Sequence, residues 1–354
     1  MPDIDQIKFN TSDGPIRLLG IETSCDETAA SVVEGGRVIL SNIVASQVDI
    51  HAQYGGVFPE VASRQHVITI YPIVEQALQQ AHLTLEDLDG IAVTRGPGLS
   101  GSLVVGLNTA KGLALANDLP LIGVNHLEAH IYSAWLETPD LSPHNEPKFP
   151  LLALIVSGGH TELALMTDHL EYQRLGGTLD DAAGEAFDKV GRLLGLSYPG
   201  GPAIEVAAMG GNPRAFSFPR AWLEDSWNFS FSGLKTAVLR EVRRLEGSGL
   251  PLPVEDLAAS FQSAVVDVLV GKTISSAREF SAKEILVAGG VSANQSLRQT
   301  FQEKSEFPVH IPPLSLCTDN AAMISGAGYY RYINGQRDDL DMDALPNWPL
   351  SELT

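Results

Sequence analysis

The sequence predicts an α/β protein built from two similar halves. Its 354 residues are enough for two domains at about 150 residues each. Patterns typical of buried strands alternate with patterns typical of amphipathic helices along the chain. Each half also opens with a strand, a short turn and a second strand, in the segments GIETSCDETAASVV and IVSGGHTELALM. The repeated opening suggests an internal duplication.

In the first half, residues 17–23 predict a buried strand, and two further strands flank a hairpin turn at Gly35 and Gly36. Apolar residues from Val67 to Ala81 recur at helical spacing and predict a helix. A strand over 90–94, a glycine-rich turn, a helix of small residues, a strand over 121–124 and a helix from about His126 complete this half.

In the second half, strands from residue 151 again surround a glycine turn. Helices are predicted over 180–196, 233–246 and 255–280, and another begins near Pro202, with Gly201 at its cap. The strand EILVAGG runs into a turn and a helix. The segment TDNAAMISGAGYYRYI predicts a last helix, capped by Thr318 or Asp319.

These elements divide the chain into five parts. Residues 1–16 form an N-terminal arm, and 137–150, with four prolines, form a linker loop. The first domain comprises 17–136 together with 320–335, and the second comprises 151–319. Residues 336–354 carry several aspartates and predict an acidic, solvated tail.

Composition narrows the function classes. Hydrophobic residues make up 44% and charged residues 19%, which argues against a disordered chain. We find neither an apolar run of about 18 residues nor a signal peptide, and two cysteines argue against a disulfide framework, so we expect a soluble cytoplasmic protein without a membrane partner. The net charge of −20 favours a small-molecule enzyme, and a nucleic-acid partner would need a local basic patch or a helper subunit.

The segment GPGLSG at 96–101 matches a dinucleotide-binding fingerprint. However, Pro97 stiffens the turn, and the acidic residue downstream, Asp118, precedes the next strand instead of ending it. Ser102 stands where a P-loop would have lysine. We therefore predict a tight turn between strand and helix, with a nicotinamide or flavin site as the alternative.

His126 and His130 are four residues apart, so on a helix both side chains project from one face and supply half of a metal site. Glu128 lies about 200° around the helix and cannot serve as the base of a metalloprotease. Asp319 would complete a His₂Asp set with an open position. The alternatives are core or capping histidines and an aspartate that caps a helix.

Glycine-rich turns at 157–161 and 289–294 could bring backbone N–H groups close to an anion. Asp188 flanks the buried stripe of an amphipathic helix. Another helix begins at Gly201, and the exposed N–H groups of its first turn could hold a hydroxyl or phosphate group. Each of these signals is weak alone, and each turn has a purely structural alternative.

In their order, the two hairpins and the GGxxxN turn resemble the superfamily of actin, Hsp70 and sugar kinases. This resemblance implies two ribonuclease H-like domains that face each other across a nucleotide cleft. Glu22 departs from the pattern, because those ATPases place a metal-binding aspartate there. Routine Mg-ATP hydrolysis is therefore not expected.

A more specific resemblance covers residues 20–323 in the same order of motifs. The chain resembles the TsaD (Gcp/YgjD) family, whose members make N6-threonylcarbamoyladenosine in tRNA. The motifs that carry the resemblance are GIETSCDETAA, HAQYGGVFPEVASRQHV, RGPGLSGSLVVG, NHLEAH, VSGGHTEL, GEAFDKVGRLLGLSYPGGP, FSFSGLKTAV, AGGVSANQSLR and CTDNAAM.

The resemblance implies a site in three parts. The metal ligands would be His126, His130 and Asp319, holding one divalent ion, iron in the first place and zinc as the alternative. Asp26 and Glu27 would face the same cleft, and we assign one of them, from its chemistry and not from the resemblance, to take the proton of the amine. Glu205 stands where the family often has Asp. The adenylate would be bound by Ile155, Val156, Ser157, Gly158, Gly159, Asp188, Gly201, Glu205 and Asn294.

The implied reaction moves a threonylcarbamoyl group from threonylcarbamoyl-AMP to N6 of adenosine 37, 3′ of the anticodon, in tRNAs that read codons beginning with A. ATP or ADP could also occupy the cleft. A TsaC/Sua-type synthase would supply the adenylate, and a TsaB-like paralogue and a TsaE-like ATPase would be partners. The alternatives are a metalloendopeptidase acting on glycoproteins and a nucleotide-gated scaffold or chaperone.

Two surfaces are candidates for macromolecular contacts. The amphipathic helix from Val67 to Ala81 could dock a paralogous subunit or pack inside its own domain. The predicted helix over 233–246 carries a basic group that could contact tRNA, and its members are Lys235, Arg240, Arg243 and Arg244.

Overall fold

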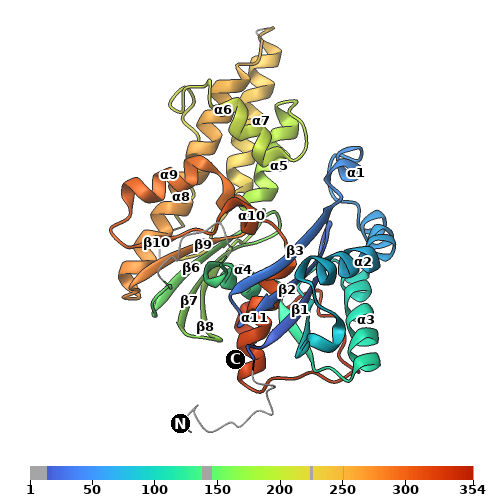
Figure 1. Ribbon diagram of the computed structural model, residues 1–354. Helices are drawn as coiled ribbons and strands as arrows, with labels where there is room; N and C mark the ends of the chain where they lie inside the picture. Colours follow the sequence, from blue (N-terminus) through green and yellow to red (C-terminus); the bar gives the residue numbers. More distant parts are fainter. Residues whose placement is uncertain (1–13, 138–145, 224–225, 250, 354) are drawn as a thin grey trace.

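The computed structural model describes residues 14–137, 146–223, 226–249 and 251–353 (Figure 1). The predicted arm lies almost wholly outside these residues, as does most of the predicted linker loop. The predicted domain boundaries stay predictions. Below, the first domain is the first sheet with the helices packed on it, and the second domain is the second sheet with its helices.

The first sheet has five strands in the order β3-β2-β1-β4-β5. Strands β1 to β3 form an antiparallel meander, and β4 and β5 add parallel to β1. Gly35 and Gly36 link β2 to β3 and have φ values of 59° and 71°, which favour glycine. The bounds are β1 Arg17–Glu22, β2 Glu27–Glu34, β3 Val38–Ser46, β4 Gly90–Gly96 and β5 Leu121–Asn125.

The second sheet repeats this topology, in the order β10-β9-β6-β7-β8. Strands β6 to β8 are the antiparallel meander, and β9 and β10 add parallel to β6. The equivalent strand orders agree with the duplication that the sequence suggested. The bounds are β6 Leu151–Val156, β7 Thr161–Asp168, β8 Glu171–Gly177, β9 Glu284–Ala288 and β10 Val309–His310.

The helices form layers around the two sheets (Figure 1). Helices α2 and α3 pack on the outer face of the first sheet, α4 and α11 lie between the sheets, and α8 covers the outer face of the second sheet. The α-helix bounds are α1 Val48–Ala52, α2 Pro59–Ala81, α3 Ser100–Asn117, α4 His126–Tyr132, α5 Ala183–Leu193, α6 Gly200–Ala208, α7 Ser232–Gly247, α8 Val254–Glu279, α9 Gln295–Lys304, α10 Leu314–Cys317 and α11 Ala321–Ile333. Short 3₁₀ helices are η2 Leu85–Asp87, η3 Ser133–Trp135, η4 Gly290–Ala293 and η5 Leu350–Glu352.

Three helix starts differ from the prediction. Helix α2 begins eight residues early, at Pro59, because a proline is favourable in the first turn. Helix α6 begins at Gly200 after Pro199, not at Pro202. Helix α11 is capped by Asn320, whose side chain accepts from Met323 N at 3.1 Å, so neither Thr318 nor Asp319 is the cap.

The prediction of a solvated tail is wrong for the residues that the structure describes. Asp338 accepts from Gly123 N at 2.7 Å and pairs with Arg95. Met342 and Leu350 are buried. The charged pattern hid these buried apolar residues. Met342 packs in the core of the first domain, and η5, which contains Leu350, contacts β8.

Helix α8 is long and apolar enough to cross a membrane by length and composition. However, 83% of its most apolar 18-residue window is buried inside the protein, which is the packing of a core helix. Phe261, Val265 and Leu269 lie in the core of the second domain.

Candidate metal centre and active-site cleft

The carboxyl ends of the central strands of both sheets open into one cavity of about 450 Å³. Both equivalent hairpins contribute to its wall, through the turn after β1 and the turn after β6. The parallel strands contribute as well, through residues 97–99 after β4 and through Gly290, Val291, Ala293 and Asn294 after β9. The cavity thus lies at the loop positions where an α/β sheet ordinarily binds its ligand.

Two histidines enter the site from α4, which follows β5 directly. Asn125 starts this helix, because its side chain accepts from Leu127 N at 2.9 Å and from Glu128 N at 3.2 Å. One turn separates His126 and His130, so their rings are neighbours with centroids 4.7 Å apart. The predicted pair on one helical face is confirmed.

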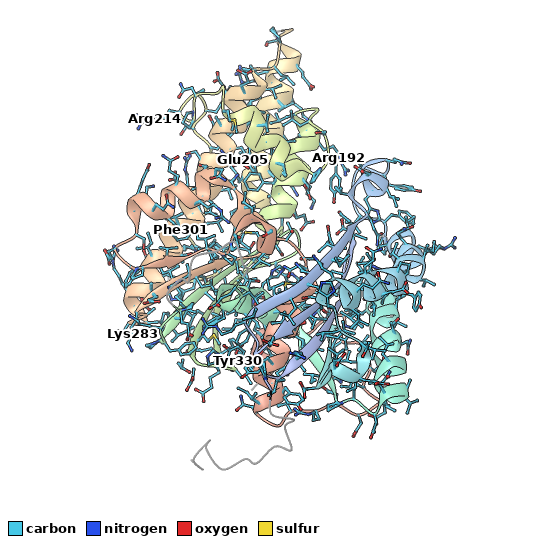
Figure 2. The ribbon with its side chains drawn as sticks, viewed as in Figure 1. Arg192, Glu205, Arg214, Lys283, Phe301 and Tyr330 are labelled. Carbon is cyan, nitrogen blue, oxygen red and sulfur yellow. The ribbon has the colours of Figure 1, made fainter. Side chains whose placement is uncertain are left out.

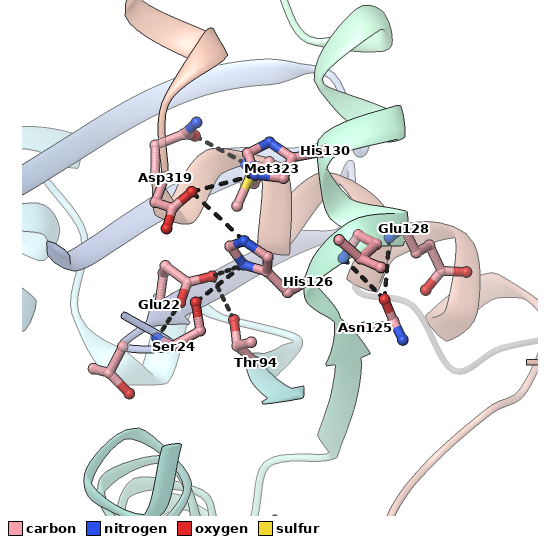
Figure 3. Close-up of polar contacts among 12 residues, drawn as sticks. Glu22, Ser24, Thr94, Asn125, His126, Glu128, His130, Asp319 and Met323 are labelled. Atoms are coloured by element: carbon pink, nitrogen blue, oxygen red, sulfur yellow. Dashed lines mark hydrogen bonds and ion pairs between the residues drawn. The ribbon is translucent and has the colours of Figure 1, made fainter. Parts of the chain in front are cut away.

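Asp319 reaches this pair from the segment between α10 and α11 (Figure 3). Its Oδ1 lies 3.5 Å from His126 Nε2 and 3.2 Å from His130 Nε2. Because Asn320 caps α11, the Asp319 carboxylate is not needed by that helix and can face the imidazoles. The spacing of the sequence left this choice open, and the geometry resolves it.

The cluster fits a divalent transition metal. One ligand atom from each of His126, His130 and Asp319 lies within 4.8 Å of the others. His130 is fully buried, yet neither of its ring nitrogens has a hydrogen-bond partner among the described residues. An unpaired buried nitrogen beside a carboxylate oxygen is costly without a cation between them. Two imidazoles and one carboxylate are a set that iron or zinc accepts, with positions left for substrate.

Glu22 orients the first histidine from the end of β1. Its Oε2 lies 3.0 Å from His126 Nδ1 and accepts from Thr94 Oγ1 at 2.8 Å, while Oε1 accepts from Ser24 N (Figure 3). The carboxylate places the proton of His126 on Nδ1, which leaves the Nε2 lone pair facing Asp319. Glu22 stands where the ATPases have a metal-binding aspartate, but here its carboxylate orients His126.

The charges of the cluster agree with this arrangement. Burial would lower the pKa of His126, but Asp319 and Glu22 outweigh burial and raise it to about 9. Burial would raise the pKa of Asp319, but His126 and His130 lower it. For His130 burial dominates and lowers the pKa. The site without a metal thus holds a proton on His126 that a cation would replace.

Glu128 points away from the cluster, as its place on the helix predicted (Figure 3). It is fully buried, accepts from Tyr172 Oη at 3.0 Å and pairs with Arg331 Nε at 2.6 Å. Its carboxylate therefore ties α4 to β8 and α11. A metalloprotease base cannot come from this residue.

Asp26 and Glu27 line the cavity beside the cluster. Burial, together with Asp319 and Asp26, raises the pKa of Glu27 to about 9, against a hydrogen bond from Ser46 Oγ that lowers it. With this pKa the carboxyl group of Glu27 is protonated near neutral pH in the site without a metal. A cation on Asp319 would weaken one of the charges that raise it.

The wall from the second domain combines glycine turns with polar and aromatic side chains. Ser157, Gly158 and Gly159 line the cavity after β6, and a Cβ at either glycine would meet no described atom within 4 Å. Gly201 is equally open. Asp188, from α5, lines the cavity and accepts from Gly200 N at 2.7 Å. Burial raises the pKa of Asp188.

Asn294 and Glu205 complete this wall. Asn294 caps α9 by accepting from Leu297 N at 3.0 Å, and its Nδ2 donates to Gln262 Oε1 at 2.8 Å. Glu205 accepts from Gln295 N at 2.6 Å. Both residues line the cavity, so each combines a structural bond with a position beside a ligand.

Two of the expected adenylate residues are not on the cavity wall. The side chains of Ile155 and Val156 are fully buried in the cores on the two faces of β6. Only their backbone leads into the turn at Ser157. The remaining seven, namely Ser157, Gly158, Gly159, Asp188, Gly201, Glu205 and Asn294, are brought together.

Other residues, which the sequence did not predict as site residues, also line the cavity. His160 follows the glycines of the second hairpin, and burial together with His126 and His130 lowers its pKa to about 4. Tyr198 and the turn Pro97–Leu99 also line the cavity. The glycines of GPGLSG serve close packing, because a Cβ at Gly98 would lie 2.6 Å from Ser24 O. Membership in a motif was the only signal available for these residues.

Comparison with known proteins gives one description for the family model and for the relatives. The family model described as "TsaD: tRNA N6-adenosine threonylcarbamoyltransferase" matches residues 38–326. A protein of that description from Dehalococcoides mccartyi is 58% identical over 331 residues, which cover 94% of this chain and 98% of the relative. Relatives of the same description from Thermomicrobium roseum and Geobacillus kaustophilus are 57% and 54% identical, over 94% and 95% of this chain and 96% and 97% of their own lengths.

Solved structures give the fold at low identity. HypF from T. kodakarensis matches 91% of this chain and 48% of its own with a TM-score of 0.59 and 17% identity. Component A of the (R)-2-hydroxyglutaryl-CoA dehydratase of Acidaminococcus fermentans matches 90% of this chain and 99% of its own with a TM-score of 0.50 and 15% identity. These neighbours and the two repeated sheets confirm the predicted ribonuclease H-like fold of two facing domains.

Proposed function

The chain belongs to the TsaD family of tRNA N6-adenosine threonylcarbamoyltransferases, and we propose that its cleft transfers the threonylcarbamoyl group of threonylcarbamoyl-AMP to N6 of adenosine 37 in tRNAs that read codons beginning with A. The observation that carries the proposal is one cavity with two different walls. The His₂Asp cluster forms one wall, and the open glycine turns form the other. A cation on the His₂Asp cluster would stabilise charge on a carbonyl oxygen, and the backbone N–H groups of the glycine turns could bind the phosphate of a nucleotide.

His126, His130 and Asp319 hold one divalent metal ion in this proposal, iron in the first place and zinc as the alternative. When bound there, the ion supplies Lewis-acid stabilisation for the negative charge that develops on the carbamoyl oxygen. Glu22 keeps His126 in the tautomer that presents Nε2 to the ion. The fully buried His130 limits access of water from behind.

The second domain holds the adenylate. The N–H groups of Gly158 and Gly159 contact the phosphate, and Asp188, Glu205 and Asn294 contact the ribose and base. ATP or ADP binds the same wall as a competitor. Fixing the leaving phosphate opposite the cluster orients the carbamoyl carbon toward the incoming amine.

The transfer balances without a covalent intermediate on the protein. The lone pair of adenosine N6 forms a bond to the carbamoyl carbon, the bond from that carbon to the phosphate oxygen breaks, and AMP leaves with the electron pair. The amine loses one proton, and Glu27 accepts it, with Asp26 as its neighbour in the turn. With no cation present, burial and the charges of Asp319 and Asp26 hold the pKa of Glu27 at about 9, which keeps its carboxyl group protonated near neutral pH. A cation bound at Asp319 would offset one of these charges and favour the ionised form that accepts the proton.

The proposal includes partners in the cytoplasm. A TsaC/Sua-type synthase supplies the adenylate, a TsaB-like paralogue docks on α2, and a TsaE-like ATPase resets the complex. The outer face of α2 suits such docking, because Val67, Ile68 and Tyr71 are 64%, 67% and 70% exposed. The inner face of the same helix, with Ile70 and Val74, is packed in the first domain.

Nucleoside mass spectrometry tests the function. The protein and its partners are incubated with tRNA and preformed threonylcarbamoyl-AMP, without ATP, and threonylcarbamoyladenosine is measured. We expect a product in a single round of transfer and its loss in Asp319→Asn, while the exposed Asp341→Asn serves as the matched control. Absence of product with wild-type protein would overturn the proposal. Peptide release from glycoproteins by the same preparation would favour the endopeptidase.

A further inference from the structure

We propose that His66 is a positioning residue for the transfer reaction, because it holds the chain on both sides of the turn that carries Asp26 and Glu27. The inference rests on the proposed function, in which these two carboxylates face the reacting amine. His66 itself is not part of the cavity wall and acts through the turn.

The contacts of His66 bracket the two acids. Its Nε2 lies 2.9 Å from the carbonyl oxygen of Cys25, which directly precedes Asp26. Its Nδ1 lies 2.8 Å from Oγ1 of Thr28, which directly follows Glu27. One buried imidazole on α2 therefore clamps the first and last residues of a four-residue segment.

The chemistry of the partners fixes which tautomer does this. A carbonyl oxygen can only accept, so Nε2 carries the proton and donates to Cys25. Nδ1 is then an acceptor for the hydroxyl of Thr28. Burial lowers the pKa of His66, which keeps the ring neutral and this acceptor available.

The same pattern of bonds continues behind His66. Gln47 Nε2 lies 3.4 Å from His66 Nδ1, and Gln47 Oε1 lies 3.2 Å from Nε2 of His51. His51 Nδ1 accepts from Phe58 N at 3.3 Å, and Gln47 N donates to Asp26 O at 3.0 Å. His51 can therefore donate from Nε2 to Gln47 while its Nδ1 accepts from Phe58. The path attaches the turn to the loop between α1 and α2.

That loop also contacts the second domain. Arg192, on the side of α5 that faces the first domain, donates to the carbonyl oxygen of Gly55 (Figure 2). The turn with Asp26 and Glu27 is therefore held from α2 and, through the loop, from across the cleft. Any buried imidazole needs partners for its nitrogens, but those of His66 are found at the two ends of the segment that carries Asp26 and Glu27.

Two substitutions separate positioning from packing. In His66→Gln the side-chain amide reaches the place of Nε2 and can donate to Cys25 O. In His66→Asn the amide reaches only the place of Nδ1, so the bond to Thr28 survives and the bond to Cys25 is lost. Ile70→Val, on the same buried face of α2, provides a control for loss of stability.

We expect His66→Asn to lower kcat by about 10- to 100-fold, the loss expected for a small displacement of reacting groups. KM for tRNA and for the adenylate, and metal content by elemental analysis, should stay within about twofold, because neither binding wall is touched. His66→Gln should recover most of the loss. Amide hydrogen exchange of residues 25–28 should be faster in His66→Asn than in His66→Gln.

The proposal is overturned if both substitutions keep the wild-type kcat and the wild-type exchange of residues 25–28. It is also overturned if the kcat of both falls in proportion to melting temperature, as in Ile70→Val, or if the loss follows metal content. Failure of the proposed function would appear differently, as absent transfer by the wild-type protein. Hydrogen exchange of the turn tests the role of His66 even then.

Discussion

The two hairpins that open the domains have the same place in the same sheet topology and opposite properties. The turn after β1 is acidic and tightly held, with Glu22 accepting from Ser24 and Thr94 and with His66 bound on both sides of Asp26 and Glu27. The turn after β6 has two glycines whose Cβ positions face open space. A duplicated scaffold has thus given one wall of fixed charges and one wall of accessible backbone.

This difference shows how the cleft divides its work. Burying a charge is costly unless neighbouring groups compensate it, so the polar contacts of the first wall are formed before a ligand binds. Backbone N–H groups bind an anion wherever it can come within hydrogen-bonding distance, so on the second wall the ligand itself supplies the acceptors. Substitutions on the two walls should therefore separate metal content from nucleotide affinity.

The largest effect is expected on the first wall. His126→Ala with His130→Ala removes two of three ligands, so the protein should lose its metal and about 4 kcal/mol of transition-state stabilisation, or roughly 10³-fold in rate. Elemental analysis and nucleoside mass spectrometry measure the two losses, with adenylate affinity unchanged. Full metal occupancy in the double variant would disprove the site.

The second wall should respond in the opposite way. Gly158→Val places a branched side chain in the cavity without a backbone clash, since no described atom lies within 4 Å of its Cβ. Adenylate affinity should fall by about 10- to 100-fold, as for overfilling a packed site by 1–3 kcal/mol. Calorimetry with AMP measures the loss, and metal content should not change. Equal AMP affinity in variant and wild type would place the nucleotide elsewhere.

A smaller effect on metal affinity is expected when Glu22, which orients the ligand His126, is replaced. Glu22→Gln keeps the shape of the side chain but weakens the bond that holds the His126 tautomer, so metal affinity should fall about 10- to 100-fold. Competition with a chelator measures this affinity. Thr94→Val, which removes the neighbouring donor to Glu22 but not the carboxylate, serves as the milder control. An unchanged affinity in Glu22→Gln would restrict Glu22 to a structural role.

Acid should lower the free energy of unfolding, because a buried neutral histidine lies beside each of the two hairpins. Burial lowers the pKa of His66 behind the first turn and of His160 in the second, the latter to about 4. Below about pH 6.5 the unfolded chain takes up protons that the folded site refuses, so the free energy of unfolding falls as pH falls, by at most about 1.4 kcal/mol per pH unit for each histidine. The loss for His160 extends toward pH 4.

Denaturant unfolding between pH 7.5 and pH 4.5 measures this slope. His160→Gln should flatten it down to about pH 4, and His66→Gln should flatten it below about pH 6.5. A wild-type slope that neither substitution changes would contradict the assignment to these two histidines.

The smallest effect is expected on the basic face of α7. Lys235 pairs with Asp181 and Arg244 pairs with Glu241, so Arg240 and Arg243 carry most of the available charge of the predicted group. Reversing Arg240, Arg243 and Arg244 to Glu should flatten the slope of log K for tRNA against log salt by about one to two units. Adenylate affinity should not change. An unaltered slope would place the tRNA surface elsewhere.

The sequence predicted elements and motifs better than it predicted proximity. The histidine pair could be found because helical spacing fixes two side chains on one face. The approach of Asp319 could not, since an aspartate before a helix is also a typical cap, and only the structure assigns the cap to Asn320. The role of Glu22 was hidden for the same reason, because its partner His126 lies 104 residues away.

The sequence also misjudged surfaces. Aspartates in residues 336–354 suggested a solvated end, although Met342 and Leu350 anchor it, because a few buried side chains give no periodic signal. On α2, Val67 and Tyr71 belong to the apparent helical stripe yet lie exposed, while His66 is buried. The spacing of apolar residues identifies the helix. It does not say which of them face the core and which lie on a surface that a partner protein could cover.

The position of α11 between the sheets has a consequence for how the protein is made. Its residues pack on β1 and β4, yet they leave the ribosome after the whole second sheet has been synthesised. The part of the inner face of the first sheet that α11 covers therefore stays exposed while more than half of the chain is added. We expect the later-made domain to finish folding first, and the earlier-made one to depend on chaperones until translation ends.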